Sequence, residues 1–242
     1  ILLRLPDGRI GKLRSYVYGL KQASYEWYQR IREVLVSNAF VQTEDPCVFK
    51  QWHGDDCIFV CIHVDDVFAI ATTELLHDAL DAMLEEQFAD GEIRILSRHT
   101  GDELAYLKMR IRVATNEVTG ERTVEVDQSL YIDKIVREWG YGQSVAAAGN
   151  RLFSEDEPGL TDHPMQASYA PKEDDHVAID STWYRGVVGA INYAAGMTRP
   201  ELLYAMSVLA ESCTAPTRLH KRMVKRVLKY LKGTADRCLV FQ

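Results

Sequence analysis

Two adjacent carboxylates, Asp65 and Asp66, interrupt an otherwise apolar stretch over residues 57–70. The residues on both sides are apolar enough to form buried strands, and a charged pair inside such a stretch is costly unless something positive compensates it. A turn at Asp65-Asp66 relieves that cost, because it puts both side chains at the tip of a β-hairpin and points them out of the sheet. The sequence therefore predicts a sheet with a paired-carboxylate tip.

This tip suits divalent cations. Mg²⁺ takes a few carboxylate ligands and keeps water or substrate phosphates in its remaining positions, and two such ions about 3.5–4 Å apart support phosphoryl or nucleotidyl transfer. The alternative is a solvated Asp-Asp turn, since Asp is a common turn residue. The neighbouring pair Asp55-Asp56 follows Gly54 in a polar loop, and we interpret that pair as solvated.

The cysteines favour reduced thiols in an intracellular protein. Their number, five, is odd, and their spacing does not match a small secreted disulfide framework. Cys57 and Cys61 share one face of the expected strand with His63, but at about 3.3 Å per residue they lie roughly 13 Å apart, too far to share one zinc ion. Packed thiols are the favoured interpretation. Because no apolar run approaches the roughly 20 residues that span a bilayer, we expect no membrane partner.

Hydrophobic periodicity predicts mixed helices and strands, then an acidic segment, then helices only. The expected helices cover residues 20–36, 74–88, 129–139, 182–197, 200–213 and 218–231. The expected strands cover residues 47–52, 57–64, 67–71, 104–113 and 123–126. The acidic segment, residues 146–180, carries eight carboxylates and three prolines, and we interpret it as a poorly ordered connector or a long surface loop.

The last expected helix is strongly basic. The formal net charge of the chain is −7, which argues against a protein held on nucleic acid by total charge alone but permits a local basic surface. Cations recur on this helix with no acidic residue among them, and they could follow a nucleic-acid backbone with salt-dependent affinity. The alternative is a solvated face on a packed helix. The candidate backbone contacts are Arg218, Lys221, Arg222, Lys225, Arg226 and Lys229.

Three separated blocks give the chain a specific resemblance. The first is Lys12-Leu13-Arg14-Ser15-Tyr16-Val17-Tyr18-Gly19-Leu20-Lys21-Gln22-Ala23, followed by Trp27-Tyr28. The second is His63-Val64-Asp65-Asp66. The third includes Thr198-Arg199-Pro200 and ends with Arg226-Val227-Leu228-Lys229-Tyr230-Leu231-Lys232-Gly233-Thr234. In this order the blocks resemble the reverse transcriptase of copia-type LTR retrotransposon polyproteins.

The resemblance implies an α+β fold, a right-hand polymerase palm remnant with an antiparallel sheet and helices, followed by a mainly helical thumb and connection region. It implies partial fingers and palm over residues 1–126, a thumb-like helix over 127–145, the acidic connector over 146–180, and a helical connection region over 181–242. The ribonuclease H domain of the family would come later.

The resemblance also implies roles for particular residues. Asp65 and Asp66 would bind the catalytic metals, with Mg²⁺ expected and Mn²⁺ as the alternative ion. Gly19, Lys21 and Gln22 would lie beside the incoming nucleotide and the template. Glycine suits that position because a residue without a Cβ lets the backbone approach a ligand closely. His63 would also contact nucleotide or template.

Several positions depart from the family pattern. His63 stands where the family usually has Tyr, and Lys108 stands where it often has Gly. The family also places another metal-binding Asp on a strand well before the first block, whereas only residues 1–11 precede that block here. We therefore expect the chain to be a piece of a longer polyprotein and, by itself, to be inactive.

The expected function is that of an RNA-directed DNA polymerase fragment. Its partners would be an RNA template, a DNA primer, deoxynucleoside triphosphates and the remainder of the retrotransposon polyprotein. The first alternative is a catalytically inactive retroelement remnant that binds nucleic acid or has no function. An unrelated metal-dependent nuclease is a weaker alternative, because the sequence places no third acidic ligand.

Overall fold

The computed structural model describes residues 2–4, 6–12, 21–88, 102–115, 118–143 and 150–242. The chain divides into two compact units, Ile1–Arg98 and His99–Gln242. The described residues form an α+β fold with two four-stranded antiparallel sheets, one in each unit, and six α-helices. No helix in these described ranges is long and apolar enough to cross a membrane.

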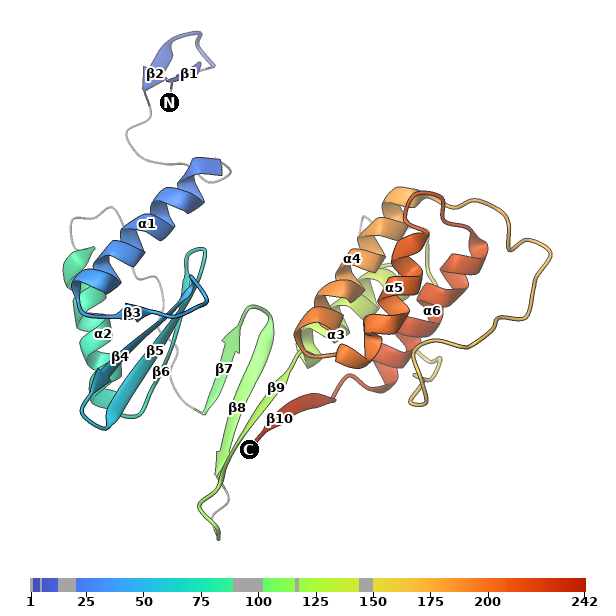
Figure 1. The fold of residues 1–242 in the computed structure, drawn as a ribbon. Coiled ribbons are helices and arrows are strands. Elements are labelled where there is room, and N and C mark those ends of the chain that lie inside the picture. Colours follow the sequence, from blue (N-terminus) through green and yellow to red (C-terminus); the bar gives the residue numbers. More distant parts are fainter. Residues whose placement is uncertain (1, 5, 13–20, 89–101, 116–117, 144–149) are drawn as a thin grey trace. The chain divides into compact units, whose positions relative to one another are not determined.

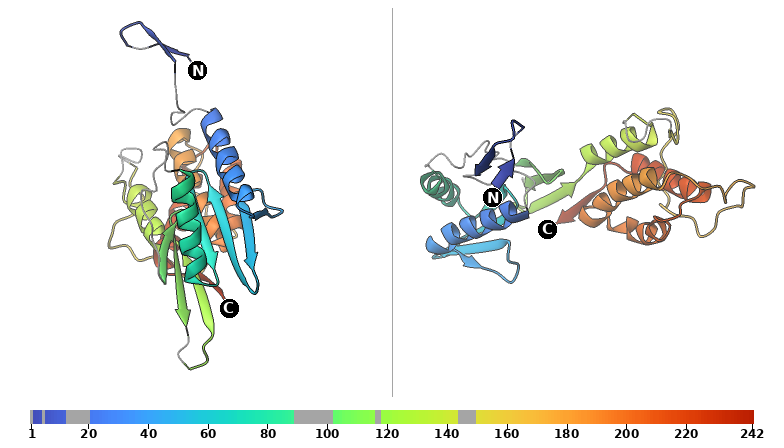
Figure 2. Two further views of the ribbon diagram at one scale, coloured as in Figure 1. Left: turned by 90° about the vertical axis from the view of Figure 1, so that its left-hand side faces the viewer. Right: turned by 90° about the horizontal axis from the view of Figure 1, so that it is seen from above.

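The first unit is a sheet covered on one face by two helices (Figures 1 and 2). Its sheet order is β3-β4-β5-β6, and a separate hairpin, β1-β2, precedes it. The elements are β1 (Leu2–Arg4), β2 (Ile10–Lys12), α1 (Lys21–Ser37), β3 (Val41–Gln42), β4 (Val48–His53), β5 (Asp56–His63), β6 (Asp66–Ala71) and α2 (Glu74–Gln87).

Alternation along β5 decides which face of this sheet is buried. Ile58, Val60 and Ile62 are buried together with apolar residues of α1 and α2. Residues between them point the other way because successive side chains on a strand alternate, and Phe59 remains 37% exposed. The apolar stretch therefore forms strands buried on one face only, where the sequence predicted buried strands.

The second unit joins a sheet to a helical cluster (Figure 1). Its sheet order is β10-β9-β8-β7, so the last strand of the chain pairs with β9. The elements are β7 (Glu103–Tyr106), β8 (Met109–Thr115), β9 (Arg122–Asp127), α3 (Ser129–Ile135) with a following π-helical turn (Val136–Gly140), α4 (Ser181–Met197), a 3₁₀ turn (Pro200–Leu202), α5 (Leu203–Glu211), α6 (Arg218–Gly233) and β10 (Cys238–Phe241).

Helices α3, α4, α5 and α6 enclose the core of the second unit. Ile132, Val187, Leu209 and Val227 are fully buried in one apolar cluster. The cluster also buries Tyr184, whose hydroxyl donates a hydrogen bond to the Leu209 carbonyl over 2.9 Å. This core fixes α6 against the other helices, so the exposed side of α6 has a defined orientation.

A buried arginine connects two parts of the third sequence block. The Arg199 side chain is only 1% exposed and its Nε lies 2.7 Å from Glu201 Oε1. Its Nη1 donates to the Thr234 carbonyl over 3.0 Å, and its guanidinium lies 5.6 Å from the centre of the Tyr230 ring. The block thus joins the turn before α5 to the end of α6, which gives these residues a structural role.

Candidate functional site

The β5–β6 hairpin brings the predicted carboxylates to its tip. His63 pairs with Asp66 as the last register pair, and Val64 and Asp65 form the connection. The turn therefore lies one residue earlier than the sequence predicted, and Asp66 begins β6. Asp65 and Asp66 are both exposed, in agreement with the expectation that they leave the apolar sheet.

Strain at this tip is visible in its backbone. Val64 has a φ of 55°, which is unusual for a β-branched residue because its Cβ crowds the backbone there. The Trp27 indole N–H of α1 donates a hydrogen bond to the Val64 carbonyl. The Trp27 ring also packs against Phe88, with 5.6 Å between the ring centres. A side chain of the first sequence block thereby holds the strained turn against the helix layer.

Asp66 and His63 share the sheet face that the helices leave uncovered. They are cross-strand partners in an antiparallel pair, so their side chains lie on one face. Cys61 and Phe59 belong to the same face because they alternate with the buried residues of β5. Burial raises the pKa of the Cys61 thiol, with the charges of Asp45 and Cys47 as smaller causes, so this thiol is protonated at neutral pH.

The donor atoms at the tip fit a hard divalent ion. Carboxylate oxygens are ligands that Mg²⁺ prefers, and it fills its other positions with water and phosphate oxygens. Within the described ranges, no group of three His, Cys, Asp or Glu side chains has a metal-binding arrangement. In that part of the chain, Asp65 and Asp66 therefore offer two carboxylates only. An ion bound there would take its remaining ligands from water, substrate or further carboxylates.

The other predicted nucleotide contacts lie at the start of α1. Gly19 is outside the described residues, Lys21 begins α1, and Gln22 is exposed in the first turn. Gln22 precedes Trp27 by five residues, about 7.5 Å along a helix axis. The end of α1 that carries Gln22 is thus about one and a half turns from the residue that contacts the hairpin tip.

The basic face of α6 is covered by carboxylates from the acidic segment. We use the name acidic strap for residues 154–175, which contain no helix or strand. Arg222 donates from Nη1 to both Asp175 carboxylate oxygens, each over 2.7 Å. Arg218 pairs with Asp174. The segment expected to be a disordered connector or a surface loop is thus a surface loop with defined contacts.

The same pattern continues toward the end of α6. Glu157 Oε2 lies 3.4 Å from Lys225 Nζ and 3.3 Å from Lys229 Nζ, and Asp162 lies 2.8 Å from Arg226. The strap also approaches the helix backbone, since the Leu160 N–H donates to the Lys229 carbonyl over 2.8 Å. Five of the six predicted backbone contacts therefore have carboxylate partners within the chain.

Ion pairing changes the ionisation of the strap. The hydrogen bond from Arg218 lowers the pKa of Asp174, and the hydrogen bond from Arg222 lowers the pKa of Asp175. Lys221 is the exception among the six predicted contacts, because its Nζ bonds Asn150 Oδ1 over 3.0 Å and lies 5.3 Å from the centre of the Trp183 ring. The sequence pattern located these cations, but it gave no signal of their partners.

Lys108 occupies the turn between β7 and β8. Leu107 and Lys108 have φ values of 48° and 60°, the left-handed region that glycine adopts without strain. Tyr193 donates to the Leu107 carbonyl, and Lys108 Nζ lies 5.4 Å from the centres of both the Tyr131 and Tyr193 rings. These contacts explain how Lys is accommodated where the family pattern often has Gly.

Comparisons with known proteins agree with the sequence blocks. A family model described as reverse transcriptase (RNA-dependent DNA polymerase) matches residues 5–144. The chain is similar to the retrovirus-related Pol polyprotein from transposon RE2 of Arabidopsis thaliana, 33% identical over 230 residues, covering 93% of this chain and 14% of the relative. It is also similar to the retrovirus-related Pol polyprotein from transposon TNT 1-94 of Nicotiana tabacum, 27% identical over 237 residues, covering 95% of this chain and 16% of the relative.

A shorter relative covers the chain almost completely. A putative transposon Ty5-1 protein of Saccharomyces cerevisiae is 24% identical over 240 residues, which is 99% of this chain and 70% of that protein. The chain thus spans about one seventh of the length of the two plant polyproteins. No solved structure matches the chain.

Proposed function

Because this chain belongs to the reverse transcriptase (RNA-dependent DNA polymerase) family of copia-type retrotransposon polyproteins, we propose that it carries part of a nucleotidyl-transfer site at the β5–β6 tip. In the proposed reaction the primer 3′ hydroxyl attacks the α-phosphate of a deoxynucleoside triphosphate. A phosphodiester bond forms and pyrophosphate leaves. The template is RNA.

Asp65 and Asp66 are the proposed metal ligands. Divalent ions bound there would supply charge stabilisation for the attacking and leaving oxygens. The two carboxylates of this chain would hold these ions. Trp27 is a positioning residue, because its hydrogen bond to the Val64 carbonyl restrains the turn that carries Asp65. His63, on the face it shares with Asp66, is proposed to contact the primer end or the nucleotide.

Residues 1–126, which include the first unit and most of strands β7 to β9, are proposed to be partial fingers and palm, and the helices of the second unit a thumb and connection region. Gly19, Lys21 and Gln22 are proposed contacts for nucleotide and template. The exposed side of α6 is proposed to face the nucleic-acid backbone. The subdivision at residues 126, 145 and 180 remains a prediction.

One observation carries this proposal. A solvated turn has no need for a β-branched residue at a φ of 55°, and strain of this kind persists where surrounding structure imposes it, commonly at functional sites. Here the surrounding structure is identifiable, since a tryptophan of a helix 37 positions earlier donates to the strained residue. The tip is therefore built to hold its two exposed carboxylates in a fixed position.

A primer-extension assay on an RNA template with Mg²⁺ tests the proposal. It compares the parent chain with Asp65→Asn and Asp66→Asn, both as this chain and as a chain extended upstream in its reading frame. Asp55→Asn is the matched control, because it removes an exposed carboxylate from the adjacent hairpin loop. We expect extension by the longer parent and control and a loss of at least about 100-fold in both tip variants.

The alternative is a catalytically inactive retroelement remnant. It is favoured by the two-carboxylate set at the tip, which no third ligand completes within the described residues. Absence of extension by every version, including the longest, would favour the remnant. Equal extension by the parent and the Asp65→Asn variant would remove Asp65 from the mechanism.

A further inference from the structure

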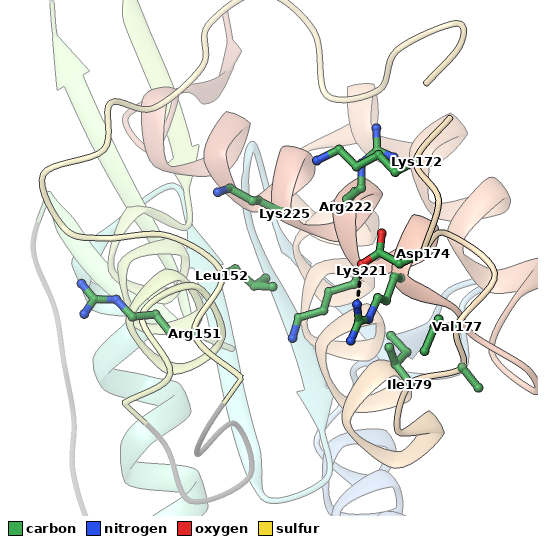
Figure 3. Close-up of a pocket in the computed structure, with 11 residues that line it drawn as sticks. Arg151, Leu152, Lys172, Asp174, Val177, Ile179, Lys221, Arg222 and Lys225 are labelled. Atoms are coloured by element: carbon green, nitrogen blue, oxygen red, sulfur yellow. Dashed lines mark hydrogen bonds and ion pairs between the residues drawn. The ribbon is translucent and has the colours of Figure 1, made fainter. Parts of the chain in front are cut away.

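A pocket opens beside α6 at the C-terminal end of the acidic strap, which contributes Lys172 and Asp174 to the lining. Its volume is about 500 Å³, and it is enclosed by α6 and by residues on both sides of the strap. Figure 3 shows Lys221 of α6 reaching between Leu152 on one side and Ile179 on the other. The lining residues are Arg151, Leu152, Lys172, Asp174, Val177, Ala178, Ile179, Arg218, Lys221, Arg222 and Lys225.

This lining has a large excess of positive charge. It contains six Lys or Arg side chains and a single carboxylate, Asp174. Three of the cations are neutralised, because Arg218 pairs with Asp174, Arg222 with Asp175, and Lys225 with Glu157. The remaining three, Arg151, Lys172 and Lys221, have no carboxylate within ion-pair distance among the residues that the structure describes.

The central one of these cations is held in place at an electrostatic cost. Lys221 Nζ donates a hydrogen bond to the Asn150 amide oxygen over 3.0 Å and lies 5.3 Å from the centre of the Trp183 ring. Neither neighbour carries a negative charge. Burial lowers the pKa of Lys221, and the charge of Arg218 lowers it further. A bound anion would remove this penalty, because opposite charge favours the protonated amine.

We propose that this pocket is a binding site for phosphate groups, with Arg151, Lys172 and Lys221 as its principal ligands. Arg offers a planar fork of donors for oxyanions, and Lys supplies a compact positive charge. The six lining cations, less the three carboxylates Asp174, Asp175 and Glu157 that pair with them, leave about three positive units at the pocket, which matches a short run of backbone phosphates or one polyphosphate. Leu152 and Ile179, on opposite sides of Lys221 (Figure 3), provide apolar surfaces that the sugar or base of a phosphorylated ligand can contact.

The inference deepens the proposed function and rests on it for the source of the phosphates, which we take to be a nucleic-acid strand. It changes which residues of the second unit make the contact. Of the six α6 cations first expected to touch the backbone, the five with carboxylate partners become secondary. The contact moves to Lys221 and to Arg151 and Lys172, which lie outside α6.

Fluorescence anisotropy of a labelled single-stranded oligonucleotide tests the site with the whole chain. The pocket variant is Lys172→Gln/Lys221→Gln. The matched control is Lys134→Gln/Arg137→Gln, which removes two exposed cations of the same unit that lie outside both α6 and the pocket lining. We expect the pocket variant to bind about tenfold more weakly, with the slope of log K against log salt reduced by about 1.4, while the control retains nearly the parental slope.

Two further arms keep the test decisive. Lys172→Arg/Lys221→Arg restores the charge and is expected to restore binding. Because Arg also restores the cation–π contact with Trp183, the urea unfolding midpoint of Lys172→Gln/Lys221→Gln is measured alongside, and a nearly parental midpoint separates a lost phosphate contact from a folding defect. Tripolyphosphate competition identifies the source: displacement of the oligonucleotide shows that the phosphate groups alone suffice, and no displacement shows that the strand is required.

Equal weakening in the pocket and control variants would overturn the proposal, and so would a parent chain that binds neither ligand. Primer extension by the longer chain is a separate readout, because the site proposed for it includes Asp65 in the other unit. Conversely, loss of extension in Asp65→Asn with unchanged oligonucleotide binding would leave the phosphate site intact. The two proposals therefore fail separately.

Discussion

Replacement of Arg199 is expected to cost the second unit a large part of its stability. In Arg199→Leu the guanidinium loses its contacts to Glu201 and to the Thr234 carbonyl and hydroxyl. Hydrogen bonds from a charged donor contribute about 1.5–3 kcal/mol each, but they do not add fully, and the leucine recovers some apolar packing. Because Thr234 is only 2% exposed, its carbonyl and hydroxyl lose a donor that water does not replace, at about 1–3 kcal/mol each, and we expect a total loss of about 3–5 kcal/mol.

Urea unfolding followed by tryptophan fluorescence measures this loss, since Trp139 and Trp183 both belong to the second unit. With an m-value of about 2 kcal/mol/M, the midpoint falls by about 1.5–2.5 M. Arg199→Lys keeps the charge but not the fork of donors, so its expected loss is smaller.

Arg237→Gln is the matched control for Arg199→Leu. Arg237 also stacks on Tyr230, with 5.5 Å from its guanidinium carbon to the ring centre, but it is exposed and is expected to cost less than about 1 kcal/mol. A loss below about 1 kcal/mol in Arg199→Leu, or one equal to that of the control, would refute the conclusion that the buried contacts of Arg199 stabilise this unit.

Three other changes give distinct outcomes in the same unfolding assay. Gly233→Ala is expected to cost about 1–3 kcal/mol by overpacking, since a Cβ there would lie 2.3 Å from the Leu160 carbonyl oxygen; no loss would contradict the close docking of the strap. Val64→Gly is expected to stabilise the first unit by roughly 0.5–1 kcal/mol, because relief of the positive φ exceeds the added chain entropy, and destabilisation would contradict it. Burial lowers the pKa of His220, whose Nδ1 accepts a hydrogen bond from the Thr217 N–H. The neutral His220 therefore contributes fully to folding stability above about pH 6.5. This contribution declines as the pH falls below that value, because the unfolded chain binds the proton more readily than the folded chain. His220→Gln should flatten the dependence of the urea midpoint between pH 7.5 and 5.5, and an unchanged slope would exclude His220 as its cause.

The hairpin tip was predictable because its signal is local. An apolar stretch interrupted by two carboxylates has few solutions, and the structure places Asp65 and Asp66 at the tip as expected. The register could not be predicted from the same signal. Burial of Ile58, Val60 and Ile62 fixes which residues face the helices, and a sheet that satisfies this pattern pairs His63 with Asp66 and leaves Val64 in the turn.

Contacts between distant residues could not be predicted from local patterns. The sequence blocks drew attention to Trp27 and Arg199, but the acceptors of their hydrogen bonds, Val64 and Thr234, are 37 and 35 positions away. The pairing of β10 with β9 joins residues more than 100 positions apart, and no hydrophobic period encodes such a pairing. The resemblance drew attention to Trp27 and Arg199, and the fold shows which hydrogen bonds their side chains make.

The acidic strap resolves the contrast between a net charge of −7 and a strongly basic helix. The sequence allowed either a solvated basic face or a nucleic-acid interface, and the structure shows a third arrangement in which the chain supplies the counterions itself. Exposed ion pairs contribute only about 0–1 kcal/mol each, so a nucleic-acid strand can displace them at modest cost. Such an exchange releases strap carboxylates in place of bulk counterions, however, and it therefore adds little to the salt dependence of binding. Among the cations beside the strap, the salt slope should consequently report those without a carboxylate partner, and these include Arg151, Lys172 and Lys221 of the pocket.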